Sequence, residues 1–173
     1  MKMEPVSKDA LKEKASRIKL ILLDVDGTLT DGQLILGPAG EIYKSFNVKD
    51  GLGIHLAQKE GIEIGLISGR WSRIVEDRAK ELEILHVWQC VKDKCALFKE
   101  ILNQFDLNAE EVAFMGDDLN DLPLLKHVGF SAATGDAVYE VQDSVDYIAQ
   151  RDGGKGAVRE FIDFIRSTRD KGI

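Results

Sequence analysis

Two carboxylates one residue apart, Asp24 and Asp26, follow the apolar run 20–23 and precede Gly27 and Thr28. A continuous apolar run bounded by turn residues is typical of a buried strand in a parallel sheet. Ligands of such sheets bind beyond the carboxyl ends of the strands. We therefore consider Asp24 as a nucleophile that attacks phosphorus and Asp26 as a general acid and base. The alternative is an ordinary turn at the end of a strand, because Asp and Gly favour turns.

Three later apolar runs also end in polar residues. The run 62–67 precedes Ser68-Gly69-Arg70, the run 84–88 precedes Lys94, and the run 112–115 precedes Gly116-Asp117-Asp118-Leu119-Asn120-Asp121. Alone, Ser68 is an ordinary capping serine and Lys94 a surface lysine. In this order, the four motifs resemble those of the haloacid dehalogenase superfamily of phosphotransferases. Ser68 and Lys94 would then hold the phosphoryl oxygens through hydrogen bonds and positive charge.

The superfamily resemblance also implies a magnesium site. Mg²⁺ prefers hard oxygen ligands, and the resemblance assigns this role to the carboxylates of Asp24 and Asp117 and to the carbonyl oxygen of Asp26. Asp118 and Asp121 have two open interpretations. Either residue supports or ligates the metal, or it lies at a helix N-terminus, where the helix dipole favours an acidic side chain.

Strand and helix patterns alternate along the chain. We expect strands near 19–25, 62–67, 85–89, 111–115, 128–132 and 145–148, and helices near 51–60, 71–83, 94–105, 119–126, 137–142 and 156–168. Turn residues at 37–40 predict a β-hairpin over 33–48. The alternation predicts an α/β fold with a doubly wound parallel sheet. A polar N-terminal extension, 1–18, would precede one domain over 19–173.

Composition narrows the classes of partner and compartment. A length of 173 residues suits one domain with a sizeable core. The net charge of −7 argues against nucleic acid or an anionic membrane as a partner. An anionic substrate would therefore need a bound cation and a local group of basic residues. No run reaches the roughly 20 apolar residues of a membrane span, and residues 1–18 lack a signal-peptide core. We expect a cytosolic protein in which Cys90 and Cys95 are reduced thiols.

The intervals between the motifs are too short to hold a cap domain. Between Asp24 and Ser68 there is room for the hairpin and one helix, and between Ser68 and Lys94 for one helix and a short strand. We therefore expect a capless domain with a hairpin flap and a site that is open in a monomer. Such a site suits a macromolecular substrate, or an oligomer in which a neighbouring subunit supplies the lid.

Several segments resemble one capless branch, the 3-deoxy-D-manno-octulosonate 8-phosphate (KDO 8-phosphate) phosphatase family. The matching segments are 47–51, 69–70, Arg78, 93–94, 116–118 and 153–160. The resemblance implies a cytosolic, Mg²⁺-dependent homotetramer of lipopolysaccharide biosynthesis, with packed hairpins and sites closed by neighbouring subunits. The residues expected to bind the sugar phosphate are Thr28, Asn47, Val48, Lys49, Asp50, Gly51, His55, Gly69, Arg70, Arg78 and Lys94.

One departure from the family and two rival functions stay open at this point. His55 stands where the family resemblance leads us to expect a basic residue such as arginine, whereas His86 and His127 match no metal-ligand spacing and are expected to be structural or exposed. One rival function is a phosphatase for another nonulosonate, such as a sialic-acid-type 9-phosphate. Arg70 favours the KDO branch, because a glutamate at that position resembles the 9-phosphate branch. Another rival is a non-catalytic tetramerisation domain, against which the intact motif residues argue.

Overall fold

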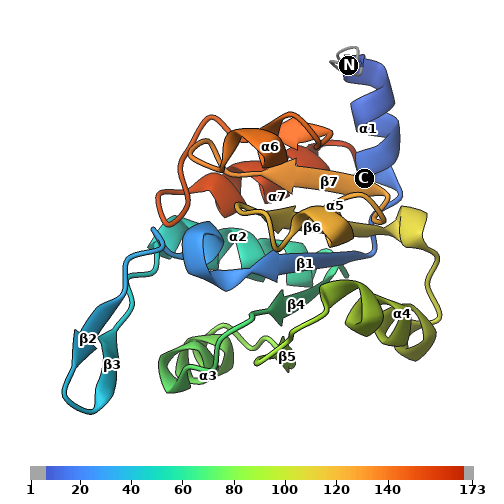
Figure 1. The fold of residues 1–173 in the computed structure, drawn as a ribbon. Coiled ribbons are helices and arrows are strands. Elements are labelled where there is room, and N and C mark those ends of the chain that lie inside the picture. Colours follow the sequence, from blue (N-terminus) through green and yellow to red (C-terminus); the bar gives the residue numbers. More distant parts are fainter. Residues whose placement is uncertain (1–6, 170–173) are drawn as a thin grey trace.

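Six parallel strands form the central sheet of this computed structural model, which describes residues 7–169 (Figure 1). The strands are β1 (Leu20–Asp24), β4 (Glu63–Ile67), β5 (His86–Trp88), β6 (Val112–Gly116), β7 (Phe130–Ala133) and β8 (Tyr147–Ile148). Their order is β5-β4-β1-β6-β7-β8. The chain winds outward from β1 to β5 and then returns to β6 beside β1, so the order reverses at this pair. The predicted doubly wound sheet is confirmed.

Helices cover both faces of the sheet. They are α1 (Lys8–Ser16), α2 (Val48–Lys59), α3 (Arg73–Glu81), α4 (Lys94–Phe105), α5 (Leu122–Leu125), α6 (Tyr139–Gln142) and α7 (Ala157–Ser167). Along β1, Ile21 and Leu23 join the core shared with α1, α2, α3 and α7, whereas Leu20 and Leu22 join the core shared with α4, α5 and α6. This alternation is expected of a strand buried on both faces. Among the described residues, every helix falls short of the length and apolarity that a membrane crossing requires.

Several element boundaries differ from the sequence prediction. Helix α2 begins at Val48 and is capped by Asn47, whose side chain accepts from the backbone N–H of Lys49 at 2.8 Å. Residues 48–51 therefore form the first turn of the helix and not a loop. The helix expected at 119–126 shortens to α5. Helix α1 was not predicted, yet it lies in the polar segment 1–18 and contributes Ala15 to the core; residues 1–6 lie outside the described part.

The hairpin is shorter than predicted and projects from the main body (Figure 1). It pairs β2 (Ile35–Gly37) with β3 (Gly40–Tyr43) in an antiparallel ribbon separate from the main sheet. Leu34, Leu36 and Tyr43 are exposed on or beside it. Between β1 and β4 the chain forms a short turn, this hairpin and α2, and between β4 and α4 it forms α3 and β5. The described residues thus contain no inserted cap domain.

A tight, kinked turn, η1 (Val25–Leu29), follows β1 and carries Asp26, whose backbone is not helical. Its Gly27 has a φ of +94°, and a Cβ there would lie 2.0 Å from an Asp117 carboxylate oxygen. A loop near the C-terminal helix packs against the turn from another direction, because a Cβ at Gly153 would lie 1.8 Å from the carbonyl oxygen of Gly27. The N–H of Gly154 also donates to the carbonyl of Thr28 at 3.0 Å. The segment 153–154 therefore holds the turn in place.

We predict that Gly153→Ala lowers the free energy of unfolding by about 3 kcal/mol, because its methyl group meets backbone that has little freedom to move. The control is Gly61→Ala, where a Cβ has no atom within 4 Å and only the positive φ of +77° opposes the change. That control is expected to lose about 1 kcal/mol. Urea unfolding measures both values, and a smaller loss in Gly153→Ala than in Gly61→Ala would contradict the packing shown here.

Candidate active site

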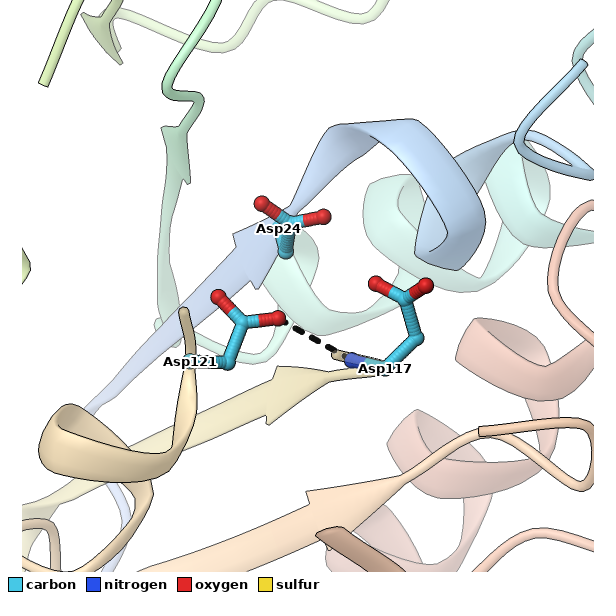
Figure 2. Close-up of side chains that lie close together, drawn as sticks. All are labelled: Asp24, Asp117 and Asp121. Carbon is cyan, nitrogen blue, oxygen red and sulfur yellow. Dashed lines mark hydrogen bonds between the residues drawn. The ribbon is translucent and has the colours of Figure 1, made fainter. Parts of the chain in front are cut away.

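Three carboxylates converge at the carboxyl ends of β1 and β6 (Figure 2). Asp24 ends β1, Asp117 directly follows β6, and Asp121 precedes α5. Because β1 and β6 pair in parallel, their carboxyl ends reach the same edge of the sheet. Each residue offers an oxygen that lies within 4.8 Å of those of the other two. We call Asp24, Asp117 and Asp121 the acidic cluster.

Lys94 joins two members of the acidic cluster. Its ammonium nitrogen lies 2.6 Å from Asp24 Oδ1 and 2.5 Å from Asp121 Oδ1. The side chains of all three residues are almost completely buried. Lys94 is the first residue of α4, and Asp93 caps that helix by accepting from the N–H groups of Cys95 and Ala96. Buried charges need partners of opposite sign, and here a capped helix start supplies one.

Asp121 and Asp118 have different environments. Asp121 Oδ2 accepts from the backbone N–H of Asp117 at 3.0 Å, and a Cβ at Gly116 would lie 2.4 Å from that oxygen. Asp121 therefore supports Lys94 and the loop that bears Asp117. Asp118 is exposed, and its Oδ1 accepts from the N–H of Leu119 at 2.7 Å. Of the two residues considered as support for a metal site, the structure brings Asp121 into the cluster and leaves Asp118 outside it.

The acidic cluster carries more negative charge than Lys94 balances. Burial and the Asp121 carboxylate raise the pKa of Asp24 well above its ordinary value, although Lys94 opposes the shift. Burial and the carboxylates of Asp121 and Asp118 raise the pKa of Asp117 to about 7. A divalent cation between these groups would favour their ionised forms. A compact set of hard oxygen donors matches the preference of Mg²⁺, so the residues present fit the predicted ion.

Ser68 lies beside the acidic cluster at the end of β4. Asp24 pairs with Ile67 in the sheet register, which places Ser68 one residue beyond that level. Ser68 is buried, and its hydroxyl oxygen accepts from the N–H of Arg70 at 3.1 Å. Gly69 and Arg70, which directly follow Ser68, are exposed. The register therefore places Ser68 on the strand next to Asp24, at the same edge of the sheet.

The environment of Thr28 differs from the sequence expectation. Thr28 was expected to bind the sugar phosphate, but its hydroxyl donates to Asp117 Oδ1 at the long distance of 3.5 Å. Thr28 is fully buried, and its backbone carbonyl accepts from Gly154. Thr28 therefore lies between the turn after β1 and the loop after β6, where it supports the acidic cluster.

Asp26 has a partner that the sequence analysis missed. The ammonium of Lys44, just beyond β3 of the hairpin, lies 2.5 Å from Asp26 Oδ1 and 2.6 Å from Glu41 Oε1. The Lys44 side chain is only 1% exposed. The separation of 18 residues between Asp26 and Lys44 follows no helix or strand period, so the available signal was the Glu41-x-x-Lys44 pair on a flap predicted next to the site.

The remaining residues predicted to bind substrate do not gather at the acidic cluster within one chain. Val48, Gly51, His55 and Arg78 line a groove of about 400 Å³ between α2 and α3. Lys49 instead lines a separate groove of about 460 Å³ with basic residues of the C-terminal part. One chain therefore presents these predicted binding residues on two surfaces.

Several of these residues have clear structural contacts. Asp50 is buried, and its Oδ1 accepts from the N–H of Arg159, which ties α2 to α7. Asn47 caps α2 and its side-chain amide donates to the carbonyl of Gly154 at 3.4 Å. The Arg78 guanidinium lies 5.6 Å from the centre of the Phe46 ring, and a Cβ at Gly51 would lie 2.6 Å from its Nη2. These contacts organise the start of α2.

The histidines and cysteines outside the site behave largely as expected. His86 packs against the rings of Trp88 and Phe105, with ring centres 5.9 and 4.7 Å apart. His127 Nδ1 lies 2.6 Å from the carbonyl oxygen of Pro123. Both have structural contacts. Cys90 and Cys95 are free thiols.

Comparisons with known proteins identify the family of this chain. A family model for haloacid dehalogenase-like hydrolases matches residues 85–162. The chain is 42% identical to the 3-deoxy-D-manno-octulosonate 8-phosphate phosphatase KdsC of Escherichia coli K12 over 96% of this chain and 88% of that protein.

Solved structures of similar proteins have the same fold. The KDO 8-phosphate phosphatase of Yersinia pestis aligns with a TM-score of 0.92 and 38% identity over 99% of this chain and 93% of that one. The enzyme of Moraxella catarrhalis, solved with magnesium, phosphate and KDO, aligns with a TM-score of 0.92 and 36% identity over 95% of this chain and 94% of that one. The chain therefore belongs to the 3-deoxy-D-manno-octulosonate 8-phosphate phosphatase family of haloacid dehalogenase-like hydrolases.

Proposed function

We propose that this chain is a Mg²⁺-dependent phosphatase that hydrolyses KDO 8-phosphate to KDO and phosphate in lipopolysaccharide biosynthesis. The observation that carries the proposal is the contact of Lys94 with both Asp24 and Asp121 next to Asp117. This arrangement supports a role for Asp24 as a carboxylate nucleophile beside Lys94 as a phosphate-binding cation. The substrate follows from the family, since the Moraxella catarrhalis relative was solved with KDO and phosphate. We place this activity in the cytoplasm, as the family resemblance implies.

The reaction has two displacements at phosphorus. An Asp24 oxygen attacks the phosphorus atom and forms an aspartyl phosphate, while the bond to the sugar oxygen breaks and Asp26 gives that oxygen a proton. Asp26 then takes a proton from a water molecule, which attacks the same phosphorus atom and releases phosphate from Asp24. Lys94 and the Ser68 hydroxyl hold the phosphoryl oxygens through both steps.

Magnesium would be held by the carboxylates of Asp24 and Asp117 and by the carbonyl oxygen of Asp26. When bound, it stabilises the negative charge that develops on the phosphoryl group. Asp121 has a different part, because one of its oxygens accepts from Lys94 and the other from the peptide of Asp117. Asp121 therefore fixes the ammonium of Lys94 relative to the loop that carries Asp117.

The active form is a homotetramer assembled through the hairpins. Leu34, Leu36 and Tyr43 expose between 43% and 61% of their surface there, and a two-stranded ribbon buries little apolar area alone. The groove that contains His55 and Arg78 lies apart from the acidic cluster of its own chain. In the tetramer, this groove contributes its basic side chains to the site of a neighbouring subunit.

Arg70 selects the sugar acid among phosphate esters. Arg70 is exposed and follows Ser68 by two residues. Burial raises the pKa of Glu41, but the hydrogen bonds from Lys44 and Ser72 outweigh burial, and the charge of Arg70 lowers the pKa further. A planar guanidinium binds a carboxylate through two hydrogen bonds, and KDO carries a carboxylate. Sialic-acid-type sugars also carry a carboxylate, so the preference for KDO 8-phosphate over their 9-phosphates rests on the resemblance of Arg70 to the KDO branch. The complete site disfavours a purely structural tetramerisation domain.

Asp24→Asn is expected to remove turnover of KDO 8-phosphate while the protein stays folded, because an amide is a poor nucleophile. A continuous phosphate-release assay measures the rate, and circular dichroism checks the fold. The matched control is Asp77→Asn, which changes an exposed carboxylate on α3 and should keep the original rate. Near-normal turnover by pure Asp24→Asn would rule out the proposed nucleophile.

Metal removal provides a second test. EDTA should abolish phosphate release, and added Mg²⁺ should restore it, because the ion supplies charge that Lys94 alone does not. Asp117→Ala should keep the fold but bind Mg²⁺ far more weakly, since it lacks one of few protein ligands. Isothermal titration calorimetry measures the binding directly. Full activity of the original protein in metal-free buffer would contradict the cofactor assignment.

The assembly is tested by Leu36→Asp, which places a charge on the exposed hairpin surface. Multi-angle light scattering at micromolar concentration should show a tetramer for the original protein and smaller species for the variant. Leu85→Asp is the control, because Leu85 is even more exposed but lies away from the hairpin. A fully active monomer of the original protein would contradict the proposed tetramer.

Substrate choice is tested by Arg70→Glu. The specificity constant for KDO 8-phosphate should fall at least tenfold more than that for 4-nitrophenyl phosphate, because only the sugar acid offers a carboxylate to Arg70. Arg73→Glu, an exposed change of the same charge on α3, controls for the altered field. Equal losses on both substrates would show that Arg70 serves the phosphate group or the fold.

A further inference from the structure

The hairpin inserts a buried cation beside Asp26. Lys44 lies just after β3, and its side chain is 1% exposed although it projects from a short two-stranded ribbon. Lysine is rarely buried unless it is paired. Its two partners are Asp26 Oδ1 at 2.5 Å and Glu41 Oε1 at 2.6 Å. One ammonium therefore connects the flap to the turn that follows β1.

The same network is anchored to a third part of the chain. The Ser72 hydroxyl, directly before α3, donates to the second carboxylate oxygen of Glu41. The N–H of Ser72 donates to the side chain of Gln89 at 2.7 Å. Glu41 is thus held from outside the hairpin while it holds Lys44. This arrangement fixes the ammonium from two sides.

Glu41 is the counter-charge of Lys44 within the hairpin, at 2.6 Å from the ammonium. Because Ser72 holds the other oxygen of Glu41, this counter-charge has a fixed position.

We propose that Lys44 is a positioning residue for Asp26, which it holds in the orientation needed to protonate the leaving oxygen of the substrate. This inference rests on the proposed function, in which Asp26 is the general acid. Lys44 keeps its own protons: the proton given to the sugar oxygen comes from Asp26 and is replaced from the attacking water. The hairpin therefore acts in catalysis within its own chain, in addition to any part in assembly.

A role through Asp26 makes the effect of Lys44 depend on the leaving group. A sugar alkoxide is a poor leaving group and needs a proton as the bond to phosphorus breaks. Dinitrophenolate leaves without one. Loss of Lys44 should therefore slow the sugar phosphate and spare 2,4-dinitrophenyl phosphate. A direct contact of Lys44 with the phosphoryl group, or a purely structural role, would affect both substrates alike.

The test measures kcat and KM of Lys44→Met and Asp26→Asn for KDO 8-phosphate and for 2,4-dinitrophenyl phosphate. For Lys44→Met, kcat/KM for the sugar phosphate should fall roughly 10²-fold and that for the aryl ester less than tenfold, because kcat/KM reports the first displacement, before Asp26 acts as a base on water. Lys44→Arg should recover part of the loss. The double variant should be no slower than Asp26→Asn, because residues that act as one unit are non-additive. Lys80→Met, an exposed change on α3, should leave both rates unchanged.

Folding and assembly are checked in the same samples by thermal unfolding and light scattering. If Lys44→Met fails to fold, Glu41→Gln takes its place, since it removes the counter-charge of Lys44 and should give a smaller loss with the same leaving-group dependence. Equal losses of kcat/KM on both substrates in folded Lys44 and Glu41 variants, or a loss that adds to that of Asp26→Asn, would overturn the inference. Equal losses of kcat/KM in Asp26→Asn itself would instead refute the general-acid role on which it rests.

Discussion

The mutual repulsion of buried carboxylates is the constraint on which this structure depends. Asp24, Asp117 and Asp121 offer oxygens within 4.8 Å of one another, in surroundings where like charges interact strongly. Burial and these neighbours raise the pKa of Asp24 and Asp117. The arrangement persists because Lys94 contacts two of the three carboxylates, and because a magnesium ion completes the balance in the active protein. The chain has a net charge of −7, so an anionic substrate is attracted only where bound cations and basic side chains make the local charge positive.

Close backbone approach lets the chain bring these groups together. Side chains at Gly27, Gly116 and Gly153 would collide with Asp117, Asp121 and the Gly27 carbonyl respectively. The turn after β1, the loop after β6 and the segment before α7 therefore meet without intervening side chains. Strand order explains why they meet here, since β1 and β6 are neighbours where the winding of the sheet reverses. The hairpin contributes Lys44, which lies outside these three segments and contacts Asp26 in the turn after β1.

The sequence predicted the features that local patterns encode. Apolar runs ending in polar residues located β1, β4, β5 and β6, and therefore Asp24, Ser68, Lys94 and Asp117. It did not predict the contact between Lys44 and Asp26, because a salt bridge across 18 residues depends on how a flap folds back. Helix α1 was missed since its amphipathic signal is weak and one small residue, Ala15, makes its buried contact. The grouping of His55 and Arg78 away from the acidic cluster likewise depends on tertiary packing.

The central claim, that Asp24 attacks the phosphorus atom, has one direct measurement. The original protein is mixed with Mg²⁺ and excess KDO 8-phosphate, quenched during turnover and treated with borohydride, which reduces an acyl phosphate to an alcohol. Peptide mass spectrometry then locates the change. We predict homoserine at position 24 in the turnover sample and unmodified aspartate in a control without substrate. Rapid phosphate release with unmodified Asp24, or reduction at another carboxylate, would contradict this account.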